Sequence, residues 1–293
     1  MIVLGADLGG TSCRVALFDG ATERGRAEGS GGAMRSGLGA TRAEEVTALA
    51  GPLLHRAGIK RADVLVVGAA GAGRDHEREE LEGALGGRHL AWRTLVTTDA
   101  ELARAAAFGV GAGVLLIAGT GSIAIGRDAQ GTARRAGGLG WRMGDQGSGY
   151  WIGQRALEAV GGMHEGFGPT TRLAEALCAA AGVQGIAGLV RWSTTATPAA
   201  VAALAPATLQ TAERGDAAAV EIRQGALDAL CRLARAAGAG PGAAAVAFSG
   251  GLIAPGGPLR PLLLAECARL GIPVHGTAID PCRGAIVLAA SVS

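Results

Sequence analysis

The sequence predicts an α/β fold built from two related halves. Its 51 glycines and 10 prolines separate apolar segments at regular intervals, and they do not collect in low-complexity tracts. Short apolar runs are each followed by helical sequence, which is typical of strands alternating with helices. Two stretches, residues 3–12 and 115–122, share a design in which an apolar run meets a turn of glycine and hydroxyl residues before strand-like sequence resumes. This repetition indicates a weak internal duplication.

Composition limits the classes of protein that the chain can belong to. Its 293 residues are 49% hydrophobic and 18% charged, which is globular composition with enough chain for two domains. A formal net charge of +2 gives no electrostatic footprint for nucleic acid or a membrane, so we expect a small-molecule partner. The sequence opens directly on an apolar strand, and charge or glycine interrupts every apolar run before about 18 residues. We therefore expect a soluble, cytoplasmic protein.

The cysteines and histidines are dispersed along the chain. Five cysteines occur, never paired at the spacing of a metal or redox motif, and we expect free thiols that are mostly buried. None of the five histidines has a second type of metal ligand at short spacing, and we expect no zinc site.

In the first half, residues 3–8 and 14–20 predict an antiparallel hairpin around the first glycine turn. Thr41 and Glu44 form a plausible capping box for a helix that Pro52 should kink or break near Gly51. Two further strands are expected at residues 64–67 and 95–97, each followed by a helix. The expected order is strand, strand, helix, strand, helix, strand, helix, and the first unit ends near residues 109–113.

The second half restarts the pattern with a return strand over residues 123–126, whose distal turn holds Asp128 and Gly131. The remaining expected elements are helices over residues 149–160, 172–181 and 199–237, the last one broken near Gly215, a strand over 245–248, a helix over 259–270 and a final helix after Pro281.

The two glycine turns are candidates for holding phosphate. Such turns leave backbone N–H groups unblocked and place hydroxyls beside them. No Walker motif is present, because the single lysine, Lys60, lies far from any glycine loop, and a dinucleotide fingerprint would run from strand into helix. Taken singly, each turn could equally be an ordinary hairpin. Together with Asp7, which follows the first apolar run, they favour a nucleotide site.

Three aspartates are candidates for the chemistry of that site. Asp7 would suit Mg²⁺ as a hard oxygen ligand, or it could cap the turn. Asp99 ends a strand and begins a helix, where it could be the N-cap or could accept the proton of a sugar hydroxyl during phosphoryl transfer. Asp145 precedes a helix in a glycine-rich segment that lets a ligand approach the backbone closely.

Five motifs together resemble one family. They are Gly5-Ala-Asp7-Leu-Gly9-Gly10-Thr11, Thr98-Asp99-Ala100, Ala118-Gly-Thr-Gly-Ser122, residues 137–153 and Phe248-Ser-Gly-Gly-Leu-Ile253. In this order they resemble the amino-sugar kinases of the BadF/BadG/BcrA/BcrD group, within the actin-like ATPase and sugar kinase superfamily, and in particular bacterial N-acetylglucosamine and glucosamine kinases. The resemblance implies two ribonuclease-H-like domains, residues 1–110 with 281–293 and residues 111–280, with a cleft that closes over ATP and sugar. It also implies a homodimer.

The resemblance also implies roles for individual residues. Asp99 would be the catalytic base toward the sugar 6-hydroxyl, and Asp7 would lie near Mg²⁺, through water. The nucleotide-contacting residues would be Gly9, Gly10 and Thr11 in the first phosphate motif, Gly119, Thr120, Gly121 and Ser122 in the second, and Gly250 and Gly251 beside adenosine. The sugar would be bound by Asp99, Asp145, Gln146 and Ser148.

The sequence also departs from the family pattern. Leu8 stands where members often carry glycine, Gln146 where many carry glutamate, and the loop over residues 30–35 lacks an asparagine that relatives use toward the sugar. The acceptor therefore stays open between N-acetylglucosamine, glucosamine, N-acetylmuramic acid and glucose. Functions of another class are a non-catalytic sugar or nucleotide sensor and an ATPase switch, although the cluster-binding cysteines of related activases have no counterpart in a glycine loop here.

Aromatic and basic residues flank the Asp145 segment. Trp141, Tyr150 and Trp151 could stack on a sugar face or serve core and rim packing. Arg142 could help to neutralise phosphate or be an ordinary surface charge.

Overall fold

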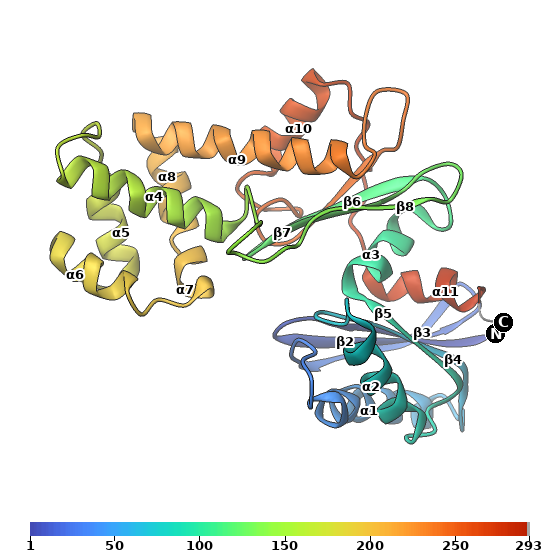
Figure 1. The fold of residues 1–293 in the computed structure, drawn as a ribbon. Helices are drawn as coiled ribbons and strands as arrows, with labels where there is room; N and C mark the ends of the chain where they lie inside the picture. Colours follow the sequence, from blue (N-terminus) through green and yellow to red (C-terminus); the bar gives the residue numbers. More distant parts are fainter. Residues whose placement is uncertain (292–293) are drawn as a thin grey trace. The chain divides into compact units, whose positions relative to one another are not determined.

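The computed structural model describes residues 1–291, which form two compact units (Figure 1). Unit 1 comprises Met1–Gly111 together with the segment from Ile279 onward, and unit 2 comprises Ala112–Ala278. Each unit has its own sheet and its own hydrophobic core, and each is described by itself.

Unit 1 is a five-stranded sheet with helices on both faces. Its elements are β1 (Ile2–Leu8), β2 (Ser12–Asp19), β3 (Thr22–Ser30), α1 (Gly39–Arg56), β4 (Ala62–Ala69), α2 (Asp75–Gly86), β5 (Ala91–Thr98), α3 (Asp99–Phe108), the 3₁₀ helix η1 (Pro281–Arg283) and α11 (Gly284–Ala289). The strand order is β3-β2-β1-β4-β5, with β1 antiparallel to β2 and parallel to β4. The predicted hairpin around the first glycine turn is confirmed.

Strand β3 was not expected, because its sequence has no apolar run. It lies at the sheet edge, pairs antiparallel with β2, and alternates exposed with half-buried residues. Two of its glycines accept side chains of α1: a Cβ at Gly25 would lie 3.2 Å from a methyl carbon of Leu53, and one at Gly29 equally close to Leu49. Strand β3 is therefore stabilised by its pairing with β2 and by the packing of α1 against it. Its own side chains bury little surface.

Helix α1 corrects two local predictions. Thr41 lies inside the helix, whose N-cap is Leu38 without a side-chain cap, so the Thr41–Glu44 capping box is wrong. The carboxylate of Glu80 on α2 caps the helix instead, accepting hydrogen bonds from the N–H groups of Gly37 and Gly39 at 3.0 and 2.7 Å. We expected a kink or a break near Gly51. The helix runs unbroken through Pro52, so the break is wrong. Pro52 is exposed, and its missing N–H removes one backbone hydrogen bond without ending the helix.

The two faces of the unit 1 sheet carry different layers. Helices α1 and α2 cover the face of Leu4, Ala6 and Leu8, while α3 and α11 cover the face of Val3. Close approach on the second face needs glycine: a Cβ at Gly5 would lie 2.4 Å from the Cys282 carbonyl oxygen. The C-terminal segment is therefore an integral layer of unit 1.

Unit 2 combines a smaller sheet with a large helical layer. Its elements are β6 (Gly113–Ala118), β7 (Ser122–Arg127), β8 (Ala133–Gly137), α4 (Gly149–His164), α5 (Leu173–Ala181), α6 (Gly185–Ser193), α7 (Pro198–Ala202), α8 (Ala205–Glu213), α9 (Ala217–Ala236), β9 (Val246–Ser249) and α10 (Arg260–Arg269). The break expected near Gly215 is confirmed, and the chain breaks again between α7 and α8. Strand β8 and helix α6 were not expected.

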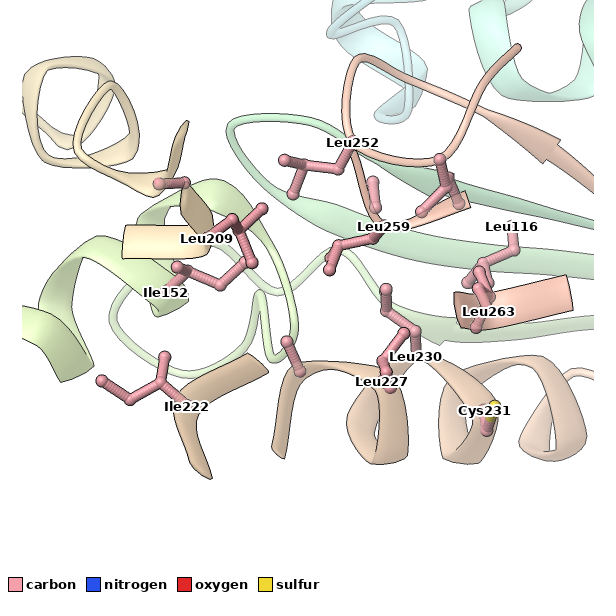
Figure 2. Packing of buried hydrophobic residues seen from close by; sticks show 14 of the residues in the cluster. Leu116, Ile152, Leu209, Ile222, Leu227, Leu230, Cys231, Leu252, Leu259 and Leu263 are labelled. Atoms are coloured by element: carbon pink, nitrogen blue, oxygen red, sulfur yellow. The ribbon is translucent and has the colours of Figure 1, made fainter. Parts of the chain in front are cut away.

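The core of unit 2 lies between this sheet and its helices (Figure 2). Leu116 of β6, Ile152 of α4 and Leu230 of α9 are all fully buried in it. The sheet order β8-β7-β6-β9, antiparallel at both β7 pairings and parallel between β6 and β9, repeats the β3-β2-β1-β4 order of unit 1. The internal duplication read from the sequence is thus present in the topology.

The five cysteines are free, and Cys178 alone among them is only partly buried. This agrees with the expectation of free, mostly buried thiols.

Among the described residues, no single helix is long and apolar enough to cross a membrane. One bent pair, α5 with α6, meets the length and composition criteria when taken together, with an angle of 58° between the helices.

Candidate active site

The first glycine turn, between β1 and β2, leaves two adjacent N–H groups open. The N–H of Gly9 donates to the carbonyl oxygen of Ser12 at 2.9 Å and closes the turn. The N–H groups of Gly10 and Thr11 donate to no protein acceptor in the described part of the chain, and both residues are exposed. Because open backbone donors on consecutive residues form an anion-binding concavity, this turn can hold phosphate oxygens.

The second glycine turn, between β6 and β7, repeats that pattern. The N–H of Gly119 donates to the Gly121 carbonyl oxygen at 2.9 Å, while those of Thr120 and Gly121 have no protein acceptor within residues 1–291. The carbonyl oxygens of Gly119 and Thr120 accept hydrogen bonds from the first two residues of α4, at 2.8 and 3.1 Å. These hydrogen bonds fix the turn on the N-terminus of α4 and do not involve the open N–H groups of Thr120 and Gly121.

The glycines of the site are of two kinds. A Cβ at Gly250, whose φ is +89°, would lie 2.4 Å from the Ala118 carbonyl oxygen, so the fold itself requires this glycine. At Gly10 and Gly251 a Cβ would meet nothing within 4 Å, and neither residue has a positive φ. These two positions therefore leave space that the protein does not need and a ligand can use.

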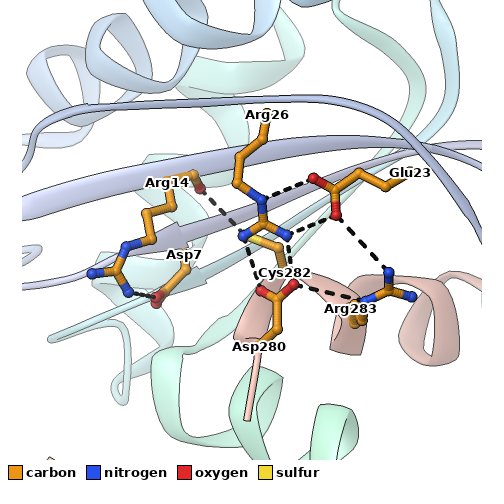
Figure 3. Close-up of polar contacts among 7 residues, drawn as sticks. All are labelled: Asp7, Arg14, Glu23, Arg26, Asp280, Cys282 and Arg283. Atoms are coloured by element: carbon orange, nitrogen blue, oxygen red, sulfur yellow. Dashed lines mark hydrogen bonds and ion pairs between the residues drawn. The ribbon is translucent and has the colours of Figure 1, made fainter. Parts of the chain in front are cut away.

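Asp7, the second-to-last residue of β1, begins a row of charges across the sheet, and Figure 3 shows its ion pair with Arg14. Arg14 of β2 is directly opposite, with its Nη1 3.9 Å from an Asp7 carboxylate oxygen, and its Nε donates to Glu28 of β3 at 3.0 Å. Burial raises the pKa of Asp7 to about 6, the nearby Asp99 adds to this, and Arg14 opposes it. Within residues 1–291 a single cation, Arg14, approaches this carboxylate, and a carboxylate that is costly to ionise is suited to a bound metal ion.

Asp99 is the first residue of α3 and does not cap that helix. The N-cap is Thr98, whose hydroxyl accepts from the N–H of Glu101 at 3.0 Å, so the capping interpretation of Asp99 is wrong. One Asp99 carboxylate oxygen accepts from the Ala100 N–H at 2.9 Å. Burial raises the pKa of Asp99 above its usual value, while backbone hydrogen bonds oppose the shift. Thr98 thus caps α3, and the Asp99 carboxylate, held at the start of the helix by the Ala100 N–H, can still accept a proton.

A second charge cluster fixes the C-terminal segment beneath Asp7 (Figure 3). Arg26 of β3 donates to Glu23 at 2.9 Å and to Asp280 at 3.1 Å, and Arg283 approaches Asp280 at 3.8 Å. The Asp280 carboxylate contributes to the raised pKa of Asp7. These contacts hold the Asp280 carboxylate in place near Asp7, while Arg26 and Arg283 balance much of its charge.

In unit 2, Asp145 braces the second turn. It adopts a φ of +61°, and its Oδ1 accepts a hydrogen bond from the Ser122 N–H at 3.1 Å. The Ser122 hydroxyl donates to the Gln146 carbonyl oxygen at 2.8 Å. The hydrogen-bonding groups of Ser122 are thus committed inside the protein, and the open donors of this turn are those of Thr120 and Gly121.

Ser148 has a structural job that sequence reasoning missed. Its side chain is fully buried, and its hydroxyl accepts from the Trp151 N–H at 3.2 Å as the N-cap of α4. Contact between this hydroxyl and a sugar is therefore corrected to helix capping. Asp145 and Gln146 remain the polar candidates of the segment.

A cavity of ≈ 500 Å³ adjoins the second turn. We call it the alanine-lined cavity, and its walls are Gly119, Thr120, Gly149, Ala199, Ala202, Ala203, Ala205, Pro206, Gly251, Leu252 and Pro258. A Cβ at Gly119 would lie 4.0 Å from the Gly251 nitrogen, so the turns at Gly119 and Gly251 meet at its rim. The wall from α7 and α8 was missed because alanine carries no chemical signal in a sequence.

The site residues divide between the units. Asp7, the first turn and Asp99 belong to unit 1, whereas the second turn, Asp145 and the alanine-lined cavity belong to unit 2. Among the described residues, no group of three or more histidine, cysteine, aspartate or glutamate side chains could hold a metal ion. A metal bound by Asp7 would therefore take most of its ligands from water and substrate, as Mg²⁺ does.

Comparison with known proteins places the chain in a family context. The model of the BadF/BadG/BcrA/BcrD ATPase family matches residues 4–262. An N-acetylmuramic acid/N-acetylglucosamine kinase of Clostridium acetobutylicum is 35% identical over 102 residues, which are 35% of this chain and 33% of that protein. An N-acetyl-D-glucosamine kinase of Dictyostelium discoideum is 43% identical over 65 residues, 22% and 20% of the two chains. The matches thus span a third or less of these curated relatives.

Solved structures match over the whole length. A provisionally named N-acetylglucosamine kinase from Chromobacterium violaceum is 28% identical with a TM-score of 0.76, and 98% of each chain is covered. A ROK family glucokinase from Streptomyces griseus, solved with glucose and AMPPNP, has a TM-score of 0.54 at 16% identity and 99% coverage of each chain, which shows likeness of fold alone. The predicted two-domain, actin-like ATPase fold is confirmed.

Proposed function

We propose that the chain, which belongs to the BadF/BadG/BcrA/BcrD ATPase family, is an ATP-dependent kinase that phosphorylates the 6-hydroxyl of an amino sugar. The observation that carries the proposal is the pair of glycine turns, each with two consecutive open N–H groups. Four backbone N–H donors suit the negative charge of a triphosphate. A sugar alone would not need so many donors.

The phosphates would be held mainly by backbone groups. The N–H groups of Gly10 and Thr11 would bind oxygens of the transferred phosphoryl group, and those of Thr120 and Gly121 would bind the remainder of the chain. Adenosine would occupy the alanine-lined cavity beside Gly251, where an apolar wall suits a base. Gly10 and Gly251, whose missing side chains leave open space, would allow this close approach.

Asp7 fits a magnesium site. Its carboxylate is partly buried and held at a raised pKa, so a cation nearby would relieve an unfavourable charge. Bound Mg²⁺ would supply neutralisation of phosphate charge as the terminal bond breaks. The protein's part is to keep this carboxylate at the end of β1, between Arg14 and the first turn, so that water-mediated contact is possible.

Asp99 would act as the general base. Its carboxylate would accept the proton of the sugar 6-hydroxyl while that oxygen forms a bond to the terminal phosphorus and ADP leaves with the bridging oxygen. The raised pKa suits proton acceptance better than that of an ordinary, strongly acidic aspartate. Asp145 and Gln146 would position the sugar through its hydroxyls.

N-acetyl-D-glucosamine is the acceptor that we propose first, because both curated relatives are named for it. Glucosamine or another hexose is the alternative. Use of ATP favours a cytoplasmic location. The homodimer implied by family resemblance stays a prediction that light scattering of the purified protein would check.

The experiment is an ADP-release assay with ATP and Mg²⁺ against N-acetylglucosamine, glucosamine, N-acetylmuramic acid and glucose. Sugar-dependent ADP release that Asp99→Asn reduces at least a hundredfold supports the proposal. ADP release without any sugar would indicate an ATPase switch. Saturable binding of ATP and sugar without ADP release would indicate a sensor, and either result would refute the kinase.

A further inference from the structure

A second cavity in unit 2 lies beside Gln146 and is distinct from the alanine-lined one. It measures ≈ 510 Å³, and we call it the aromatic cavity. Its walls come from the segment before α4 and from the first two turns of α4, namely Trp141, Arg142, Met143, Gly144, Gln146, Tyr150, Trp151, Gln154 and Arg155. The proposed phosphate turns contribute nothing to it.

The aromatic side chains of this cavity are arranged as an ordered surface. The rings of Trp141 and Tyr150 have centroids 5.5 Å apart at 58°, and Trp141 is 41% exposed. Such tilted pairs hold each other in place while leaving a face free for contact. Rings of this type, together with the amides of Gln146 and Gln154, are what a sugar's apolar face and hydroxyls need.

Two arginines give the cavity a positive charge, and one of them, Arg142, has no carboxylate partner in the described part of the chain. Its walls include no aspartate or glutamate. Arg155 lies over the Trp151 ring and is paired with Glu158 at 2.7 Å, so its charge is largely matched. The Arg142 guanidinium lies 4.3 Å from the Trp141 ring centroid, and no carboxylate pairs with it in the described part of the chain. Stacking on the ring restricts the guanidinium plane of Arg142, and its N–H donors stay able to bind a ligand.

We propose that the aromatic cavity binds a carboxylate-bearing substituent of the acceptor sugar, with Arg142 as the residue that recognises the carboxylate. This rests on the proposed function, and it names an acidic ether of N-acetylglucosamine as a second substrate class. The planar guanidinium fork matches a carboxylate in two parallel hydrogen bonds. Support also comes from the Clostridium acetobutylicum relative, whose name includes N-acetylmuramic acid, a sugar of this class.

The test compares three sugars of graded charge and size. They are N-acetylglucosamine, N-acetylmuramic acid, and the amide of N-acetylmuramic acid, which keeps the bulk of the substituent and removes its charge. Each is assayed for kcat/KM with wild type, Arg142→Gln and Arg142→Lys. Arg232→Gln is the control, because it removes the same charge from an exposed position on α9, outside the cavity.

Arg142→Gln should lower kcat/KM for N-acetylmuramic acid about ten- to a hundredfold, while changing that for N-acetylglucosamine and the amide less than twofold. Arg142→Lys should have a kcat/KM for N-acetylmuramic acid between those of wild type and Arg142→Gln. Arg232→Gln should have no selective effect on any of the three sugars. An equal loss for all three sugars, or wild type that phosphorylates N-acetylglucosamine but not the acid, would overturn the inference.

Failure of the proposed function is a separate result. If no sugar supports ADP release, the kinase proposal fails, and calorimetric titration with N-acetylmuramic acid then decides on the cavity alone. Binding that Arg142→Gln weakens at least tenfold would support a carboxylate site, and binding that is absent or unchanged in the variant would refute it.

Discussion

Replacing Asp7 by asparagine should stabilise unit 1, by an amount that grows with pH. The Asp7 side chain is only 17% exposed, and its pKa is raised from 3.8 to about 6, first by burial and then by the charge of Asp99. The folded state therefore binds this proton more tightly than the unfolded chain does. Asparagine keeps the shape of the carboxylic acid and cannot ionise.

The magnitude follows from the shift in pKa. Each pKa unit corresponds to 1.36 kcal/mol, so a shift of about two units makes ionised Asp7 cost about 3 kcal/mol of folding free energy. Because the folded pKa is the higher one, the favourable contribution of the protonated group is complete below about pH 4 and is lost as pH rises through 6. Asp7→Asn should therefore match wild type near pH 4 and exceed its stability by ~3 kcal/mol at pH 8.

The assay is urea denaturation between pH 4 and pH 8 without nucleotide or Mg²⁺, with hydrogen exchange of the β1 and β4 amides as the probe of unit 1. Asp19→Asn, at the exposed end of β2, is the control and should change stability by less than about 0.5 kcal/mol throughout. A stability difference for Asp7→Asn that does not vary with pH, or a less stable variant at pH 8, would refute the argument that Asp7 holds a costly buried charge.

Three further outcomes follow from the site. Because burial raises the pKa of Asp99, the rate of sugar phosphorylation should fall with decreasing pH at a midpoint above the usual aspartate range, as a pH profile of kcat would show. Gly10→Ala should raise the KM for ATP at least tenfold without lowering the melting temperature, whereas Gly250→Ala, at a φ of +89°, should lower the melting temperature by several degrees. Ser148→Ala should cost about 1 kcal/mol of stability in urea denaturation through the lost cap of α4, and an altered KM for sugar would argue against that role.

The turns and the parallel strands were predictable because their signals are local. A turn of glycine and hydroxyl residues between two apolar runs predicts an antiparallel hairpin. The pairings of β1 with β2 and of β6 with β7 confirm both hairpins. Where a remote partner decides, local signals mislead. Glu80 of α2 caps α1 in place of Thr41, and β3 exists because β2 and α1 supply its pairing and burial. Neither partner can be found from the segment alone.

The candidate site shows the same division. Its glycines and the three aspartates were selected as candidates from the sequence. The helix-capping roles of two neighbouring hydroxyl residues were not predicted. Thr98 caps α3 and thereby releases Asp99, while Ser148 caps α4 and is thereby removed from substrate contact. At Thr98 and Asp99 the sequence does not show which of the two residues will cap α3, because both types are good N-cap residues. Only the backbone geometry decides it.

The duplicated turns differ at the residue two positions before their first glycine, among others, and this difference explains why we place the metal ion at unit 1. Asp7 lies two residues before Gly9 in β1, and the residue at the same place before Gly119 in β6 is Ile117. In unit 2 the carboxylate beside the turn comes from another segment. It is that of Asp145, whose Oδ1 accepts a hydrogen bond from the Ser122 N–H. An aspartate satisfied by a backbone donor attracts a cation less than one left with a raised pKa and a distant arginine. Two turns with the same backbone donors thus carry different electrostatics, and the asymmetry suits a reaction in which only one end of the phosphate chain is transferred.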